Sequence, residues 1–119
     1  MIVLGDLNDE PHAATTQILH GPPGSEIGTG GFARPDQGDA SRLWNVYRRI
    51  EPDARRFSRV FNGRPEMIDH ILVSHTLVHR IDSVDTSTPT LPSIGETPAS
   101  SQHDAPSDHA AVIARFANA

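Results

Sequence analysis

The sequence predicts one α+β domain that is rich in short strands. Residues 2–4 form an uninterrupted apolar run, and residues 57–61 alternate between apolar and polar side chains, two patterns that indicate strands. Residues 39–50 instead place apolar side chains three and four positions apart, which is typical of a helix. The chain of 119 residues is long enough for one domain with its own core.

The composition excludes several classes of protein. The chain has no cysteine, so it holds no disulfide, thiolate zinc site or cysteine nucleophile. It has no apolar run of about 18 residues, so we expect no membrane span. Its 10 basic residues, all arginine, against 15 acidic residues give a net charge of −5, which argues against a nucleic-acid scaffold held by bulk charge.

The first third of the chain predicts a strand, a helix and a loop. Residues 2–4 are expected to form a strand that is buried on both faces. Residues 9–21 follow as a helix, because Pro11 suits a first helical turn and Gly21 suits the position after a helix end. Residues 21–39 are rich in glycine and proline and predict a loop, which lacks the lysine of a nucleotide-binding P-loop.

The clearest helical pattern lies at residues 39–50. Its apolar residues follow the i, i+3, i+4, i+7 spacing of one helix face. These residues are Leu43, Val46, Tyr47 and Ile50. Asp39 or Ser41 is placed to cap the helix.

A hairpin is predicted after this helix. Residues 57–61 and 67–74 read as its two strands, and residues 62–66 as the turn between them. Asn62 and Gly63 favour that turn because both residues tolerate the positive φ angles of a tight hairpin.

The last third of the chain predicts two strands and a long loop. Residues 79–86 and 107–116 each contain a short apolar pattern that indicates a strand. Residues 86–107 between them are dominated by serine, threonine and proline, which predicts a mobile loop.

Polar side chains follow the first strand directly. Asp6 and Asn8 are two positions apart, so on a continuing strand they face one spot. A carboxylate beside an amide suits metal binding, proton acceptance and contact with a phosphoryl oxygen. The alternative is that these residues only turn and cap the chain between a strand and a helix.

Asp69 is the second polar residue of interest. Alternation along residues 67–74 places it on the same face as Ile71 and Val73, while His70 shares the opposite face with apolar neighbours. A carboxylate on a buried face requires a partner, and a histidine is the natural one. The alternatives are an edge strand with Asp69 in water, or a structural ion pair with Arg64.

The third polar pair, Asp108 and His109, stands at the entry to the last strand. Before a strand begins, the backbone is free to turn both side chains into one cleft. Asp108 then suits a divalent cation, and His109 suits a phosphate oxygen, with Asp69 holding the other ring nitrogen. The alternative is a capping aspartate beside an exposed histidine.

Other polar residues carry weaker signals. The remaining histidines apart from His70 show no metal-ligand spacing and are expected at the surface; they are His12, His20, His75, His79 and His103. Six arginines between positions 48 and 64 predict a solvated helix face and turn, with phosphate contact as the alternative; they are Arg48, Arg49, Arg55, Arg56, Arg59 and Arg64. Ser107 has no GxSxG context, which argues against a serine hydrolase.

Three motifs occur in a specific order: VLGDLNDEP, IDHILVS and SDHAAVIARF. Together they resemble the C-terminal half of the endonuclease/exonuclease/phosphatase superfamily, which has the deoxyribonuclease I-like fold. The resemblance covers nearly all of the chain. The forms GDLND and DHILVS look most similar to bacterial members.

The resemblance implies half of a four-layer α/β/β/α sandwich of mixed sheets, with the strand that ends at Asp6 in a central position. It implies hydrolysis of phosphodiesters or phosphomonoesters with Mg²⁺ or Mn²⁺ at the strand ends between the sheets. Nucleic acids, nucleotides and phospholipid headgroups are all substrates of this scaffold, so the resemblance leaves the phosphate ester open.

The resemblance also implies a role for each polar residue. Asp6 orients or deprotonates the attacking water near the metal, and Asn8 contacts the scissile phosphate and the metal shell. Asp108 is a metal ligand. His109 binds and neutralises the phosphoryl group, with Asp69 as its orienting partner. Arg64 is the arginine that we expect to join Asn8 and His109 in binding the substrate phosphate.

One part of the family pattern has no match in this sequence. The resemblance implies an N-terminal half that supplies an early asparagine, a metal-binding glutamate and a further histidine or tyrosine. The chain is therefore expected to be part of a longer protein, to pair with a partner chain or as a homodimer, or to be a noncatalytic remnant. The last case predicts a binding or assembly module instead of an enzyme.

Overall fold

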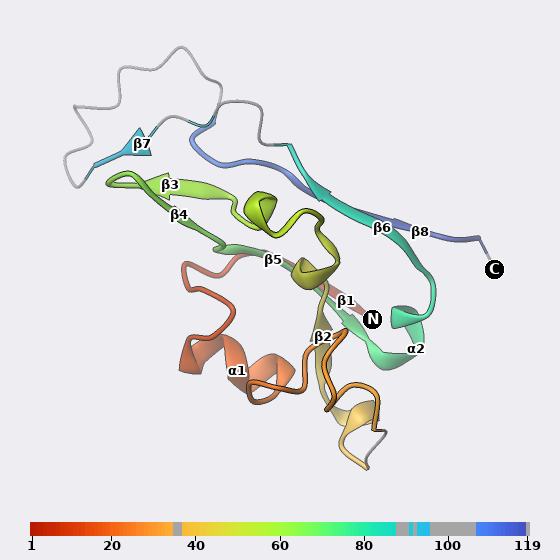
Figure 1. Ribbon diagram of the computed structural model, residues 1–119. Helices are drawn as coiled ribbons and strands as arrows, with labels where there is room; N and C mark the ends of the chain where they lie inside the picture. The colour runs from red at the N-terminus through yellow and green to blue at the C-terminus, as the bar shows by residue number, and fades with distance from the viewer. Residues whose placement is uncertain (35–36, 88–90, 92, 96–106, 119) are drawn as a thin grey trace.

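Short strands in the described part of the chain form three small sheets in this computed structural model (Figure 1). The structure describes residues 1–34, 37–87, 91, 93–95 and 107–118. The strands are β1 (Ile2–Asp6), β2 (Leu43–Asn45), β3 (Arg59–Phe61), β4 (Arg64–Glu66), β5 (Asp69–Ser74), β6 (Ile81–Thr86), β7 (Ser93–Ile94) and β8 (Val112–Phe116). The helices are α1 (Ala14–His20) and α2 (His75–Val78), with 3-10 turns η1 (Asp39–Ser41), η2 (Tyr47–Arg49) and η3 (Asp53–Arg55). The predicted α+β class is confirmed.

The sheet that positions the site has the strand order β1-β5-β2 and is antiparallel throughout. Its register pairs Leu4 with Ile71 and Asp6 with Asp69. The last residue of β1 therefore lies directly opposite the first residue of β5. Cα partners in an antiparallel ladder are about 4.5–5.5 Å apart, so this register alone brings two carboxylates together.

The other two sheets flank this central sheet. One has the order β4-β3-β7, in which β3 and β7 run parallel, and the other is the antiparallel pair β6-β8. Figure 1 shows α1 and the β6–β8 ribbon on opposite sides of β5. Within the central sheet, α1 thus covers β2 on one side, and β8 covers β5 on the other.

The hydrophobic core lies between the central sheet and β6. Its buried members are Ile27, Trp44, Val46, Tyr47, Ile50, Met67, Val73, Val78, Ile81 and Val84. Val112, Ala114 and Phe116 of β8 pack against this core. Asp69 lies on the same strand face as Ile71, which also packs against the core, so that face of β5 is turned toward β8.

The prediction that residues 2–4 are buried on both faces is wrong. Ile2, Val3 and Leu4 are 47%, 37% and 69% exposed. The physical reason is that β1 lies at the edge of the described sheet, where α1 packs mainly on β2 and β8 mainly on β5, so the faces of β1 are left largely uncovered. For the same reason, the expected central position of this strand is not seen in the described sheet.

The helix predicted at residues 39–50 is also wrong. The chain there forms η1, the strand β2 and η2, with Trp44 at the centre of β2. The apolar residues are buried as expected, because Val46, Tyr47 and Ile50 all belong to the core. A three-residue strand followed by a tight turn can bury apolar residues at the same sequence spacing as a helix face. Here the pairing of β2 with β5 selects the strand.

Two other boundaries differ from the prediction. The first helix begins at Ala14 and not near Pro11, so only the second half of residues 9–21 is helical. The hairpin turn at Asn62 and Gly63 is confirmed, with φ angles of 48° and 77°. Its return strand, however, is β4, and residues 69–74 leave the hairpin to become the middle of the central sheet.

The strands predicted near residues 79–86 and 107–116 are confirmed as β6 and β8. Most of the loop predicted at residues 86–107 lies outside the described residues. Within its described part, β7 pairs with β3. No helix in the part of the chain that the structure describes is long and apolar enough to span a membrane.

Candidate active site at the strand ends

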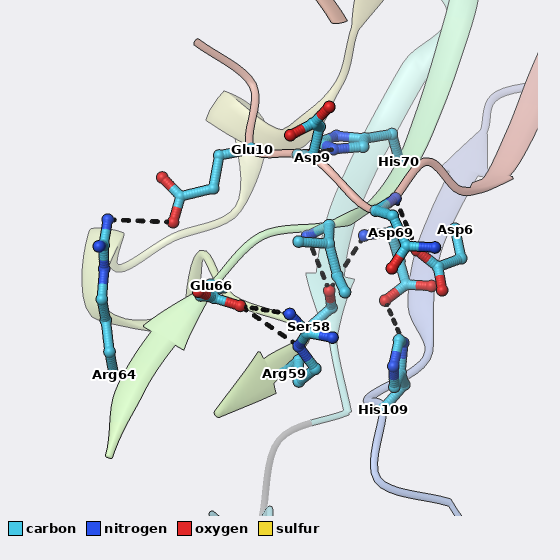
Figure 2. Close-up of polar contacts among 12 residues, drawn as sticks. Asp6, Asp9, Glu10, Ser58, Arg59, Arg64, Glu66, Asp69, His70 and His109 are labelled. Atoms are coloured by element: carbon cyan, nitrogen blue, oxygen red, sulfur yellow. Dashed lines mark hydrogen bonds and ion pairs between the residues drawn. The ribbon is translucent and has the colours of Figure 1, made fainter. Parts of the chain in front are cut away.

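Three side chains converge where β1 ends, β5 begins and the chain approaches β8. They belong to Asp6, Asp69 and His109, and one ligand atom from each lies within 4.8 Å of the others (Figure 2). The β1–β5 register explains the approach of the two carboxylates. His109 reaches them from the segment that precedes β8, on the β5 face that carries Asp69.

The closest contact in this group joins Asp69 and His109. Nδ1 of His109 lies 2.7 Å from Oδ2 of Asp69, and the two side chains are only 23% and 22% exposed. An ionised carboxylate can only accept a hydrogen bond, so Nδ1 carries the proton in this contact. The ring then presents Nε2 away from Asp69, as a fixed donor or acceptor for a further group.

Asn8 reaches the site by a different route from the one predicted. β1 ends at Asp6, and Asn8 adopts a left-handed backbone conformation with φ of 56°. Its backbone N–H donates to Oδ1 of Asp6 at 2.8 Å, which closes a tight turn after the strand. Asn8 and Asp6 are therefore linked by a turn and not by alternation along one strand face.

Asp108 is exposed and lies next to His109 in the chain. Its carboxylate is not among the three groups that converge in the described residues. The backbone at this point is held by Ser107, whose Oγ accepts the N–H of His109 at 3.1 Å. The structure thus brings together Asp6, Asp69 and His109, and it leaves Asp108 at the solvent edge.

The predicted solvated helix face of arginines is wrong, because η3 and two hairpin strands replace the helix and most of these guanidinium groups contact the protein. Arg56 donates to the carbonyl oxygens of Ile50 and Arg48. Arg59 forms a two-pronged contact with Glu66 at 2.7 and 3.2 Å. These guanidinium groups hold the fold together.

Arg64 differs from Arg56 and Arg59. Its side chain is 73% exposed, and its closest acidic group is Glu10 at 3.4 Å. The alternative pairing of Arg64 with Asp69 is not seen, since Asp69 contacts His109 instead. Arg64 therefore keeps most of its guanidinium group accessible to a ligand.

His70 is a site residue that the sequence reading placed only on an apolar face. It is 1% exposed. Its Nε2 lies 2.7 Å from the carbonyl oxygen of Asp9, and its Nδ1 lies 2.9 Å from Nδ2 of Asn45. A carbonyl can only accept, so Nε2 carries the proton and Nδ1 accepts from the amide. His70 thus ties the turn that contains Asn8 to β5 and β2.

Burial controls the protonation of His70. Desolvation lowers the pKa of its imidazole, against the opposing effect of its hydrogen bond to Asp9 and of the nearby carboxylates. The neutral ring matches its two hydrogen-bond partners, one acceptor and one donor. The sequence showed His70 beside Asp69 in β5. It did not show the hydrogen-bond partner Asn45, which lies 25 residues away in the chain.

His20 corrects the expectation that the isolated histidines lie at the surface. It is 4% exposed at the end of α1, and burial lowers its pKa. Among the described residues its Nε2 has no hydrogen-bond partner. His12 and His79 are exposed as expected, and His103 lies outside the described residues.

Two clefts lie near the ends of β1 and β5. One, of about 190 Å³, lies between β5 and the segment before β8; it is lined by Leu4, Gly5, Asp69, His70, Ile71, Ala110, Ala111 and Val112. The other, of about 370 Å³, is lined by Asn8, Asp9, Glu10, His12, Ala13, Arg59, Glu66 and Ile68. The smaller cleft thus reaches Asp69, and the larger one lies against the turn that follows β1.

The donor atoms at the site suit a hard divalent cation in part. Mg²⁺ and Mn²⁺ favour carboxylate oxygens, which Asp6 and Asp69 supply at one place. Nδ1 of His109 is already committed to Asp69, so the imidazole acts more naturally as a hydrogen-bonding group than as a ligand. Two carboxylates leave most of an octahedral shell to water, substrate or other protein groups.

Comparison with known proteins gives one match. A family model described as Endonuclease/Exonuclease/phosphatase family matches residues 1–109, which include the strand ends and all three converging side chains. No curated protein and no solved structure matches the chain.

Proposed function

Because the chain belongs to the Endonuclease/Exonuclease/phosphatase family, we propose that it takes part in divalent-metal-dependent hydrolysis of a phosphate ester. The family acts on phosphate-ester substrates, and its members generally use divalent metal ions. The observation that carries the proposal is the 2.7 Å contact between Asp69 and His109 beside the carboxylate of Asp6.

In this proposal His109 stabilises the phosphoryl group. Its Nε2 is directed away from Asp69 and is available to donate to a phosphoryl oxygen once the ring is protonated. Asp69 holds the ring orientation and balances the positive charge that then forms on it. Phosphoryl transfer depends mainly on such positioning and charge stabilisation, because the protein forms no covalent bond to the substrate here.

Asp6 is the proposed base or orienting group for the attacking water. It lies at the open end of β1, with one carboxylate oxygen already held by the N–H of Asn8. The other oxygen is free to accept a proton from water or to contact a cation. Asn8 extends past the strand end, where its side-chain amide is proposed to contact the substrate phosphate.

Asp6, Asn8 and Asp108 are the residues that we propose to hold Mg²⁺ or Mn²⁺. A bound divalent cation polarises a phosphoryl oxygen and lowers the pKa of water at the site. Asp108 is exposed on the segment that carries His109, so its carboxylate is free of the Asp69 contact and available to a cation. The remaining ligand positions are proposed to be filled from outside the described residues, by a further part of the protein, a partner chain or a second copy.

Two charge features bear on the substrate, namely the exposed guanidinium of Arg64 and the net charge of the chain. Arg64 is the exposed guanidinium beside Glu10, which itself lines the larger cleft, so we propose that Arg64 contacts a substrate phosphate. The net charge of −5 disfavours a long polyanion held by bulk attraction. A nucleic-acid end, a nucleotide or a phospholipid headgroup remain the candidate phosphate esters.

Metal titration combined with hydrolysis of bis(p-nitrophenyl) phosphate tests the proposal. We expect calorimetric binding of Mg²⁺ or Mn²⁺ and turnover that falls about a hundredfold in His109→Ala and in Asp108→Ala. His79→Ala is the matched control, because this exposed histidine lies outside the converging group and lines neither cleft. Turnover that is equal in wild type and both site variants would overturn the proposal.

A second candidate function is a noncatalytic binding or assembly module. The observation in its favour is the exposed edge of β1, where apolar side chains and an unpaired backbone face solvent among the described residues. A chain that associates tightly, binds no Mg²⁺ or Mn²⁺ and hydrolyses no phosphate ester would support this module over the enzyme.

A further inference from the structure

Ser58 stands at the junction between the three sheets and is fully buried. It lies just before β3, close to the converging residues (Figure 2). Its Oγ accepts two hydrogen bonds from consecutive backbone groups, the N–H of Ile68 at 3.2 Å and the N–H of Asp69 at 3.1 Å. A hydroxyl oxygen can accept two hydrogen bonds. Both come from backbone N–H groups at the start of β5.

The backbone of Ser58 makes two further contacts. Its N–H donates to the carbonyl oxygen of Glu66 at 2.9 Å, and its carbonyl oxygen accepts the N–H of Ala110 at 2.7 Å. Ala110 directly follows His109 in the chain. One residue therefore holds the backbone of Asp69 with its side chain and the backbone beside His109 with its carbonyl oxygen.

This link matters because, among the described residues, no strand pairing connects β5, which carries Asp69, with the segment that carries His109. β5 belongs to the central sheet and β8 to the β6-β8 pair. A cleft of about 190 Å³ opens between β5 and residues 110–112. The separation of Asp69 from His109 is thus set by contacts outside the sheets, and Ser58 supplies one to each side.

We propose that Ser58 is a positioning residue that sets the Asp69–His109 contact, an inference that rests on the proposed function only for its effect on catalysis. Loss of the hydroxyl leaves two buried N–H groups without an acceptor at the start of β5. The Asp69 backbone then shifts to recover hydrogen bonds, while Ala110 stays on the Ser58 carbonyl oxygen. The carboxylate of Asp69 is displaced relative to the His109 ring, and the ring loses its fixed tautomer.

The test is the tautomer of His109, read from the ¹⁵N shifts of its neutral ring by NMR. His109→Gln assigns the signal. We expect wild type to carry the proton on Nδ1, and Ser58→Ala to show a mixture of the Nδ1–H and Nε2–H forms. Where the enzyme turns over, kcat is expected to fall about tenfold to a hundredfold at a KM changed less than threefold.

Ser87→Ala is the matched control. Its Oγ also accepts a backbone N–H near the site, from Ala111 at 3.1 Å, but Ser87 is exposed, and among the described residues it forms no hydrogen bond with β5. We expect the Ser87 variant to keep the wild-type tautomer. A similar change in both variants would overturn the proposal, because it would show that any loosening near β8 disturbs the ring.

Two further outcomes decide the inference. A folded Ser58→Ala protein with an unchanged His109 tautomer would overturn it. If that variant does not fold, Ser58→Cys provides the same test, since a thiol fills the space of the hydroxyl and slightly more, while its sulfur accepts hydrogen bonds weakly. The NMR result stands even if wild type hydrolyses no phosphate ester, so failure of the proposed function and failure of this inference are distinguishable.

Discussion

His109 and Asp69 are 40 residues apart in the chain, and their side chains meet at 2.7 Å. Asp69 begins β5 of the central sheet, whereas His109 lies in the segment that precedes β8 of another sheet. A partly buried imidazole beside a carboxylate is a costly arrangement unless the two groups form a hydrogen bond. The contact is therefore the feature of the site that most specifically requires this fold.

Asp69→Asn tests the charge of this contact with little change in shape. Asparagine offers an oxygen or an N–H to Nδ1, so it neither fixes the tautomer nor balances a protonated ring. We expect kcat for bis(p-nitrophenyl) phosphate to fall about a hundredfold while the far-ultraviolet circular dichroism is unchanged.

Asp85→Asn is the control for this substitution. Asp85 pairs with Arg55 at 2.9 Å, but both side chains are 40% exposed, and neither residue belongs to the converging group. Surface pairs contribute little, so we expect wild-type kinetics. Equal activity of Asp69→Asn and Asp85→Asn would remove Asp69 from the proposed mechanism.

The sequence predicted the approach of Asp69 and His109 better than it predicted the elements around them. Asp6 was recognised because it follows an apolar run, Asp69 because it is a carboxylate on a buried strand face, and His109 because it precedes the last strand. Residues 39–50 were misread because their apolar spacing fits a helix face and also fits a short strand followed by a turn. Pairing of Trp44 with Val73 settles that choice, and such pairing is a long-range property.

The supporting residues could not be predicted for a related reason. Ser58 looks like any polar position in an alternating strand, and its role depends on amides at positions 68, 69 and 110. His70 looks like a histidine on an apolar face, and its role depends on Asn45 and the carbonyl of Asp9. The local sequence cannot reveal these partners, because they lie far away in the chain.

Asn45→Ala tests the buried network around His70. Asn45 is 3% exposed; its Nδ2 lies 2.9 Å from Nδ1 of His70, and its Oδ1 accepts the N–H of Tyr47 at 3.2 Å. Alanine leaves one acceptor and one donor buried without partners, at about 1–3 kcal/mol each. We expect the free energy of unfolding, measured by urea denaturation, to fall by at least about 2 kcal/mol. Asn118→Ala, at an exposed position, should change it by less than about 0.5 kcal/mol.

The burial of His20 leads us to expect that the folded state loses stability in mild acid. Burial lowers the pKa of its imidazole below the ordinary value of 6.5, so the unfolded chain binds a proton before the folded chain does. The contribution of His20 is fully present above about pH 6.5, and it is lost as the pH falls from there toward the lower pKa of the folded state. The slope from this one group is at most about 1.4 kcal/mol per pH unit.

Urea denaturation at pH 7.5 and pH 5.5 measures this effect. His20→Leu removes the proton-binding group and the unpartnered Nε2, so we expect a smaller drop in the free energy of unfolding between the two pH values than in wild type. Part of the drop should remain, because burial also lowers the pKa of His70. His79→Leu alters an exposed ring that forms no ion pair among the described residues, and it should keep the full drop. An identical pH dependence in wild type and His20→Leu would contradict the assignment.

The edge of β1 predicts association through this strand. Leu4 is 69% exposed on a strand whose outer edge is unpaired in the described sheet, and such edges bind other strands unless a charge blocks them. We expect wild type to associate with rising concentration in sedimentation velocity experiments, and Leu4→Lys to shift the chain toward monomer. Ile18→Lys is the control, because Ile18 is 82% exposed on α1 but has no free backbone edge. If both lysine variants reduce association equally, general surface hydrophobicity drives it, and if neither does, the β1 edge is not the contact.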